Sequence, residues 1–189
     1  MTPALKAPEW HYLVSVDPGL TDLGLAVYRV KKRLFRLVCE LQEVHHFGSK
    51  PVKGAPKTQD TGRRLLQLGD FLQTHLDCAC PLIGVASEEP TPLRSSTDNA
   101  KLVSSWALVI EQCRSRSVSH VALQPKAMRE FYSIPARAEK TATQEKIRSI
   151  FPDFAGWPST ARETPHCHDA AAIGYAALHL HEDLFLSRL

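Results

Sequence analysis

The sequence predicts an α/β protein in which a mixed five-stranded sheet is flanked by helices. Short apolar segments alternate along the chain with longer segments whose apolar residues recur at helical spacing. The first three short segments follow one another closely, as antiparallel strands do. The last two are separated by long helical segments, so they must join the sheet in parallel through right-handed crossovers.

The front of the chain has the pattern of three strands. The first runs through Leu13, Val14 and Val16 into Asp17, and a Pro-Gly turn ends it. In the second, Gly24 and Ala26 keep the strand slim. The third alternates apolar and polar residues, as a half-buried strand does. The expected strands span residues 10–17, 23–30 and 34–41.

Helices and two further strands make up the rest. Apolar residues recur at near-helical spacing in the long segments, and Pro125 suits the first turn of a helix. The expected helices span 58–76, 96–114, 125–131, 140–151 and 168–186. The expected strands span 82–86 and 118–123, and loops cover 48–56 and 152–165.

Composition fits one domain that spans residues 1–189. The proportions of 43% hydrophobic and 23% charged residues are typical of a globular protein. No apolar run approaches the roughly 20 residues that cross a bilayer, and the start lacks the pattern of a secretory leader. We therefore expect an intracellular protein that is not secreted and has no membrane partner.

The five cysteines are an odd number, so they cannot all pair internally, and they look like apolar fillers in a reducing compartment. A competing interpretation makes Cys78 and Cys80 half of a zinc site. His166 or His168 could complete such a site, but no second pair has a convincing spacing.

The net charge of +3 is modest, but its distribution is uneven. Any one basic residue is best explained as solvated surface. Several together favour a polyanionic partner somewhat. The basic clusters lie at 29–36, 50–64 and 126–148.

Four residues far apart in the chain have the pattern of a metal site. Asp17 and Glu88 each end a predicted strand, and His166 and Asp169 share one face of the first turn of the last helix. Each alone has a common structural explanation: a turn, a surface acid or a helix cap. Together they would repel one another unless cations lie among them, and oxygen ligands with one imidazole suit Mg²⁺ or Mn²⁺.

Such a site predicts phosphodiester hydrolysis. Two ions about 4 Å apart clamp the attacking water and the leaving oxygen, and in-line attack leaves a 5′-phosphate and a 3′-hydroxyl.

At these residues the chain resembles the RuvC family of Holliday junction resolvases. The matching segments are VSVDPGLTDLGLAVYRV, GVASEEP and HCHDAAAIGYAA, with a softer match at QPKAMREFYSIPARAEKTATQEKI. The resemblance spans about residues 12–180. It implies an RNase H-like fold, a homodimer, two Mg²⁺ ions per site with Mn²⁺ as a substitute, and no nucleotide cofactor. It also implies paired symmetric nicks in four-way DNA junctions, in the cytoplasm or wherever host or viral DNA lies.

The softer match supplies candidate DNA contacts. In the family this region carries basic residues that touch the scissile strand. Arg129 and Lys140 fall on matching positions, and Lys140 is also a candidate for stabilising the transition state. Lys126 and Arg137 lie in the same segment and are further candidates for DNA binding.

The chain departs from the family in two places. An aromatic wedge that relatives carry after the second acid is missing here, where Glu89 and Pro90 follow Glu88. Whether Glu88 or Glu89 is the ligand stays open, and the spacing favours Glu88. His166 stands where many relatives have an acid, which lowers the negative charge of the site by one.

Three other functions compete with this interpretation. The turn after Asp17 also resembles the phosphate-binding hairpin of sugar kinases and actin-like ATPases, but those proteins need two lobes. The second is a DNA-junction binding protein that does not cut, and the third is a nuclease for forks, flaps or RNA–DNA hybrids.

The helix at 96–114, with Trp106, is either the dimer surface or simply core.

Overall fold

A computed structural model describes residues 9–91, 95–135, 137–139 and 141–189 of the chain. It confirms a mixed five-stranded sheet, with strand order β3-β2-β1-β4-β5. The pairs β1–β2 and β2–β3 are antiparallel, and β1–β4 and β4–β5 are parallel. The strands are β1 (His11–Asp17), β2 (Asp22–Arg33), β3 (Arg36–Gly48), β4 (Leu82–Glu88) and β5 (Ser119–Leu123).

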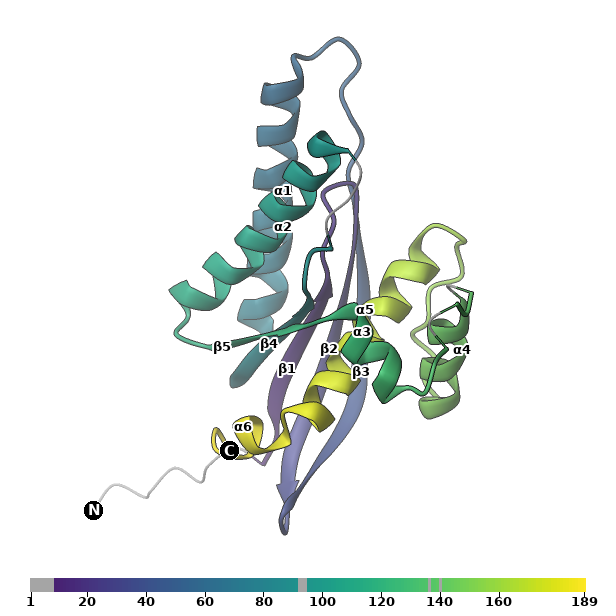
Figure 1. Ribbon diagram of the computed structural model, residues 1–189. Coiled ribbons are helices and arrows are strands. Elements are labelled where there is room, and N and C mark those ends of the chain that lie inside the picture. The colour runs from purple at the N-terminus through teal and green to yellow at the C-terminus, as the bar shows by residue number, and fades with distance from the viewer. Residues whose placement is uncertain (1–8, 92–94, 136, 140) are drawn as a thin grey trace, which may run out of the picture.

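Helices cover both faces of this sheet (Figure 1). One face packs against α1 and α2, and the other against α5 with α3, α4 and α6 around it. The helices are α1 (Lys57–Cys78), α2 (Ser96–Ser115), α3 (Pro125–Phe131), α4 (Thr141–Ile150), α5 (Glu163–Leu180) and α6 (Glu182–Leu186).

Alternation along β1 decides which residues face which helices. Val14 and Val16 pack in the core under α1 and α2. Leu13 lies in the core under α5, and the Ser15 hydroxyl donates to the carbonyl of Ala170 in α5 at 2.7 Å. Because side chains alternate along a strand, the next odd residue, Asp17, also faces α5.

Two elements differ from the sequence expectation. β3 runs on past Leu41 to Gly48 through a bulge between the pairs Val27–Glu43 and Tyr28–Leu41, and this irregularity hides the alternation from the sequence. The last helix begins at Glu163 because Pro165 falls in its first turn, where a missing backbone N–H costs nothing. It ends at Leu180, and α6 follows as a separate helix.

The contact of α5 with the sheet is unusually close at two glycines. A Cβ atom on Gly24 of β2 would lie 1.9 Å from the backbone oxygen of His166, and one on Gly174 would lie 2.4 Å from the Ser15 hydroxyl. Only a residue without a side chain permits this approach. The strand with Gly24 therefore sets how near His166 comes to the sheet.

Side-chain hydroxyls fix the position of α5 along its axis. Three consecutive carbonyls just after Asp169 each accept one hydroxyl from another element. The donors are Ser15, Tyr28 and Tyr132, and the acceptors are Ala170, Ala171 and Ala172 in the same order. These buried bonds hold the helix in one register, so its polar first turns reach a fixed place at the edge of the sheet.

The cysteines are free thiols, and three of them fit the expectation of apolar fillers. Burial raises the pKa of Cys113 and of Cys167 to about 12 and that of Cys39 to about 11. Cys78 and Cys80, however, are exposed, because they lie at the end of α1 and in the turn after it. No helix in the described part of the chain has the length and apolar character to span a membrane.

His168 has a structural environment that speaks against zinc. Its Nδ1 lies 2.5 Å from the carbonyl of Thr164, Arg148 donates to its Nε2 at 2.8 Å, and Trp157 stacks on the ring. Both ring nitrogens are engaged, so His168 packs α4 against α5.

Replacing Gly24 with alanine tests the close approach of α5. We expect Gly24→Ala to lower the free energy of unfolding by about 1–3 kcal/mol, because the added methyl group meets helix backbone. Gly62→Ala in α1 is the matched control. Its Cβ meets nothing within 4 Å, so helix propensity should make it stabilising by about 0.5–1 kcal/mol. Urea denaturation measures both, and equal effects would contradict this account of the packing.

Candidate active site

Two of the candidate acids lie side by side at one edge of the sheet. Asp17 is the last residue of β1, and Glu88 is the last residue of β4. The strands are parallel, with Val16 paired to Ser87, so Asp17 and Glu88 are neighbours across the two strands, whose backbones lie about 4.8 Å apart. The Ser87 hydroxyl contacts Trp106 of α2, which leaves Glu88 on the face toward α5.

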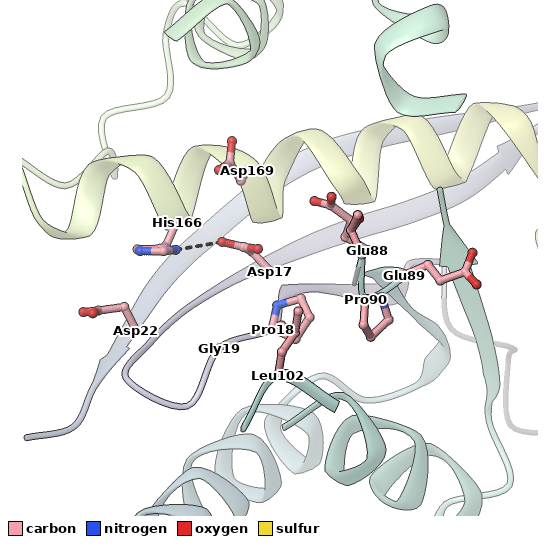
Figure 2. A pocket seen from close by; sticks show the side chains of 11 residues that line it. Asp17, Pro18, Gly19, Asp22, Glu88, Glu89, Pro90, Leu102, His166 and Asp169 are labelled. Carbon is pink, nitrogen blue, oxygen red and sulfur yellow. Dashed lines mark hydrogen bonds and ion pairs between the residues drawn. The ribbon is translucent and has the colours of Figure 1, made fainter. Parts of the chain in front are cut away.

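The helix α5 adds the other two candidates. His166 and Asp169 lie three residues apart in its first two turns and line the same pocket. Figure 2 shows the His166 ring beside Asp17. The Nδ1 atom of His166 lies 2.8 Å from Oδ2 of Asp17. The structure therefore brings together residues from β1, β4 and α5, as the sequence predicted.

All four candidates line one pocket of about 330 Å³. Glu88 points into it toward Asp17, whereas Glu89 is directed away (Figure 2). This orientation favours Glu88 over Glu89, the choice that the sequence left open. The lining residues are Asp17, Pro18, Gly19, Asp22, Glu88, Glu89, Pro90, Thr91, Leu102, His166 and Asp169.

The donor chemistry of the pocket fits a hard divalent cation. Carboxylate oxygens outnumber the single imidazole, which is the set that Mg²⁺ and Mn²⁺ prefer. As the side chains stand, no three His, Cys, Asp or Glu residues among those described converge closely enough to hold one ion. The hydrogen bond between Asp17 and His166 takes up two of the candidate ligands.

The candidate DNA-binding residues are placed unevenly. Arg129 lines a second pocket that also contains Glu88 and Asp169, so it lies beside the acids. Lys126 is exposed on α3 and lies 3.7 Å from Glu130. Arg137 is exposed and lines neither of these pockets, and Lys140 lies outside the described residues.

A buried arginine of α1 stabilises the turn between β1 and β2. Arg64 of α1 is only 4% exposed and donates to the hydroxyls of Ser49 and Thr21 at 2.8 and 2.7 Å. Ser49 in turn donates through its hydroxyl to the carbonyl of Leu20. This network orders the turn that follows Asp17. It could not be predicted from the sequence, because Arg64 has the pattern of an ordinary helix-surface residue.

Asp22 is a further acid of the pocket that the sequence analysis did not single out. Its Oδ1 accepts from Nε of Arg162 at 2.6 Å and lies 3.0 Å from Nε2 of His46. Burial by itself would raise the pKa of Asp22. The hydrogen bond and charge of Arg162, with His166 and His46, outweigh burial and lower that pKa below its usual value.

Trp106 contributes to packing next to Glu88. Its indole N–H donates to the Ser87 hydroxyl at 3.0 Å, and that hydroxyl lies 2.9 Å from Nε2 of His120. The ring of Trp106 is half-buried and makes a T-shaped contact with His120. These contacts dock α2 on β4 and β5.

The fold and the pocket define an α/β protein of RNase H-like architecture with acids at the ends of two neighbouring strands and on the last long helix. Among solved structures, the chain is similar to Thermus thermophilus RuvC in complex with a Holliday junction substrate. The TM-score is 0.65 at 20% identity, over 91% of this chain and 96% of RuvC. The chain has the fold of RuvC-type resolvases.

One eukaryotic protein and one viral protein share this fold. The yeast mitochondrial Holliday junction resolvase Ydc2 matches with a TM-score of 0.61 at 9% identity, over 98% of this chain and 84% of Ydc2. The Fowlpox virus resolvase, in complex with Holliday junction DNA, matches with a TM-score of 0.57 at 9% identity, over 90% of this chain and 98% of the resolvase. No protein-family model and no curated protein sequence matches the chain.

The half-buried imidazole of His120 predicts a pH dependence of stability. Burial lowers its pKa from 6.5, so the unfolded chain binds this proton more readily than the folded protein does. The contribution of His120 is therefore complete above pH 6.5 and is lost as the pH falls below it. We expect His120→Gln to make the acid-side decline of the unfolding free energy shallower, by at most about 1.4 kcal/mol per pH unit.

Urea denaturation at a series of pH values measures this slope. Gln73→Ala, at an exposed residue of α1 that does not titrate, is the control and should keep the wild-type slope. An unchanged slope in His120→Gln would show that the imidazole does not titrate differently on folding.

Proposed function

We propose that this protein is a structure-selective endonuclease that resolves four-way DNA junctions by paired symmetric nicks. The observation that carries the proposal is the convergence of Asp17, Glu88, His166 and Asp169 on one pocket. The fold adds support, because the similar RuvC and Fowlpox resolvase structures contain Holliday junction DNA.

In this proposal two Mg²⁺ ions bind at the pocket, and Mn²⁺ can replace them. Asp17, Glu88, His166 and Asp169 are the ligands, since they supply oxygen and imidazole donors from three elements around one space. When bound, the ions would stabilise charge on the attacking and leaving oxygens of an in-line phosphodiester hydrolysis.

The chain's own residues place the substrate and the ligands. Because α5 is fixed on the sheet through Gly24 and the three hydroxyl bonds, His166 is held against Asp17 with little freedom. Arg129 lies next to Glu88 and Asp169, where a guanidinium can bind a phosphate in two-point fashion. Lys126, Arg137 and Lys140 stay proposed DNA contacts.

A homodimer is part of the proposal. A four-way junction has two-fold symmetry and needs two cuts, so two identical sites related by the same axis would deliver them together. The helix α2 remains the proposed dimer surface, although the contacts of Trp106 with Ser87 and His120 show that this side chain also serves its own subunit.

A panel of substrates tests the proposed selectivity. With Mg²⁺ present we expect cleavage of a labelled four-way junction by symmetric nicks, and much weaker cleavage of a Y-fork, a linear duplex and an RNA–DNA hybrid. Equal cutting of all four would show a general nuclease of this fold instead. Tight junction binding without cleavage would favour the non-cutting binding protein.

Removing a proposed ligand should separate cleavage from binding. We expect Asp17→Asn and Asp169→Asn each to slow junction cleavage by more than the roughly 10–100-fold that loss of a supporting residue causes, while binding persists. Gel-shift and cleavage assays on the same samples measure both. Asp183→Asn, at an exposed acid of α6, is the control and should behave as wild type. Loss of binding together with cleavage would assign the residue a structural role.

A further inference from the structure

Three adjoining pockets form one groove across the candidate site. The central pocket shares Glu88 and Asp169 with the pocket that contains Arg129. On its other side it shares Asp22 and His166 with a pocket that also contains Lys101. The acids therefore lie in the middle of a path that has Arg129 at one end.

Arg162 stands next to the opposite end of this path. It is the residue directly before α5, and its Nε donates to Asp22, which lines both the central pocket and its neighbour. The Arg162 side chain is 46% exposed, whereas the Asp22 side chain is 20% exposed. Within the described part of the chain, no residue accepts a hydrogen bond from its terminal guanidinium nitrogens.

The carboxylate of Asp22 is well suited to hold this guanidinium. His46, whose side chain is only 10% exposed, contacts the same oxygen of Asp22 from the side of β3. The anchored Nε fixes the plane of the guanidinium and leaves its two terminal nitrogens for another acceptor. An arginine used only to brace the chain would be expected to bond through those nitrogens as well.

We propose that Arg162 binds a phosphate of the DNA strand on the far side of the cleavage site from Arg129, and that Asp22 is its positioning residue. This inference rests on the proposed nuclease function. The strand would then be gripped by an arginine on each side of the acidic centre, which fixes its direction through the groove. A planar, two-point donor at a rim is the geometry that phosphate recognition favours.

The salt dependence of junction binding tests the contact directly. Binding is measured in Ca²⁺, whose longer coordination fits the cleavage geometry poorly. We expect Arg162→Gln to weaken binding about 10-fold and to reduce the slope of log K against log salt by roughly 0.7–0.9, the value for one lost phosphate contact. Arg188→Gln is the control, because it removes the same charge from an exposed arginine that follows α6 and lines none of the three pockets.

A double-mutant cycle on cleavage tests the role of Asp22. Removing this acid should by itself favour DNA binding, because it takes a negative charge from the groove. If Asp22 positions Arg162, Asp22→Ala instead slows cleavage, and the double variant is no slower than Arg162→Gln alone. Additive losses, or faster cleavage in Asp22→Ala, would overturn the positioning role.

The outcomes separate this inference from the proposed function. A wild-type protein that neither binds nor cuts the junction refutes the function itself. A wild-type protein that cuts, with an Arg162→Gln variant of unchanged salt slope and rate, refutes only the contact. If Arg162→Gln lowers the unfolding temperature, Arg162→Lys is used in its place. We expect this variant to keep a salt-dependence slope near that of the wild type and to cleave more slowly. Cleavage at the wild-type rate would refute the two-point contact.

Discussion

The close packing of α5 on β2 is the constraint on which the candidate site depends. His166 reaches Asp17 only because the strand opposite it carries Gly24, where any side chain would push the helix away. The three hydroxyl bonds to Ala170, Ala171 and Ala172 then prevent the helix from sliding or turning. Two candidate ligands on a helix and two on strands can share a pocket only if that interface has one geometry.

The register of β1 and β4 and the alternation of side chains along them determine where the carboxylates of Asp17 and Glu88 lie. Asp17 and Glu88 end adjacent parallel strands one step beyond the pair Val16–Ser87, so both carboxylates fall at the same edge and on the face toward α5. A slip of one residue in either strand would turn its acid toward α1 and α2. The bulge between Tyr12 and Leu13 lies at the start of β1, away from the acids, and leaves this register intact.

Much of the site could be predicted from the sequence, because strand-end acids and a histidine–acid pair on one helix face are local patterns. Asp17, Glu88, His166 and Asp169 were found in this way, and the structure places them on one pocket. The pairing of Asp22 with Arg162 could not be found locally, since 140 residues separate the partners and neither has a distinctive neighbourhood. The length of β3 was missed because a bulge breaks its alternation.

The distribution of charge along the groove explains why a histidine and not an acid occupies position 166. Five acids line the central pocket, namely Asp17, Asp22, Glu88, Glu89 and Asp169, and they oppose the approach of a phosphate. One of them, Asp22, is offset by Arg162, and Glu89 is directed away. A sixth acid in place of His166 would add repulsion where α5 comes nearest to Asp17. An imidazole there can still bind a metal ion, and it adds no negative charge. In this structure it also holds Asp17 through a hydrogen bond.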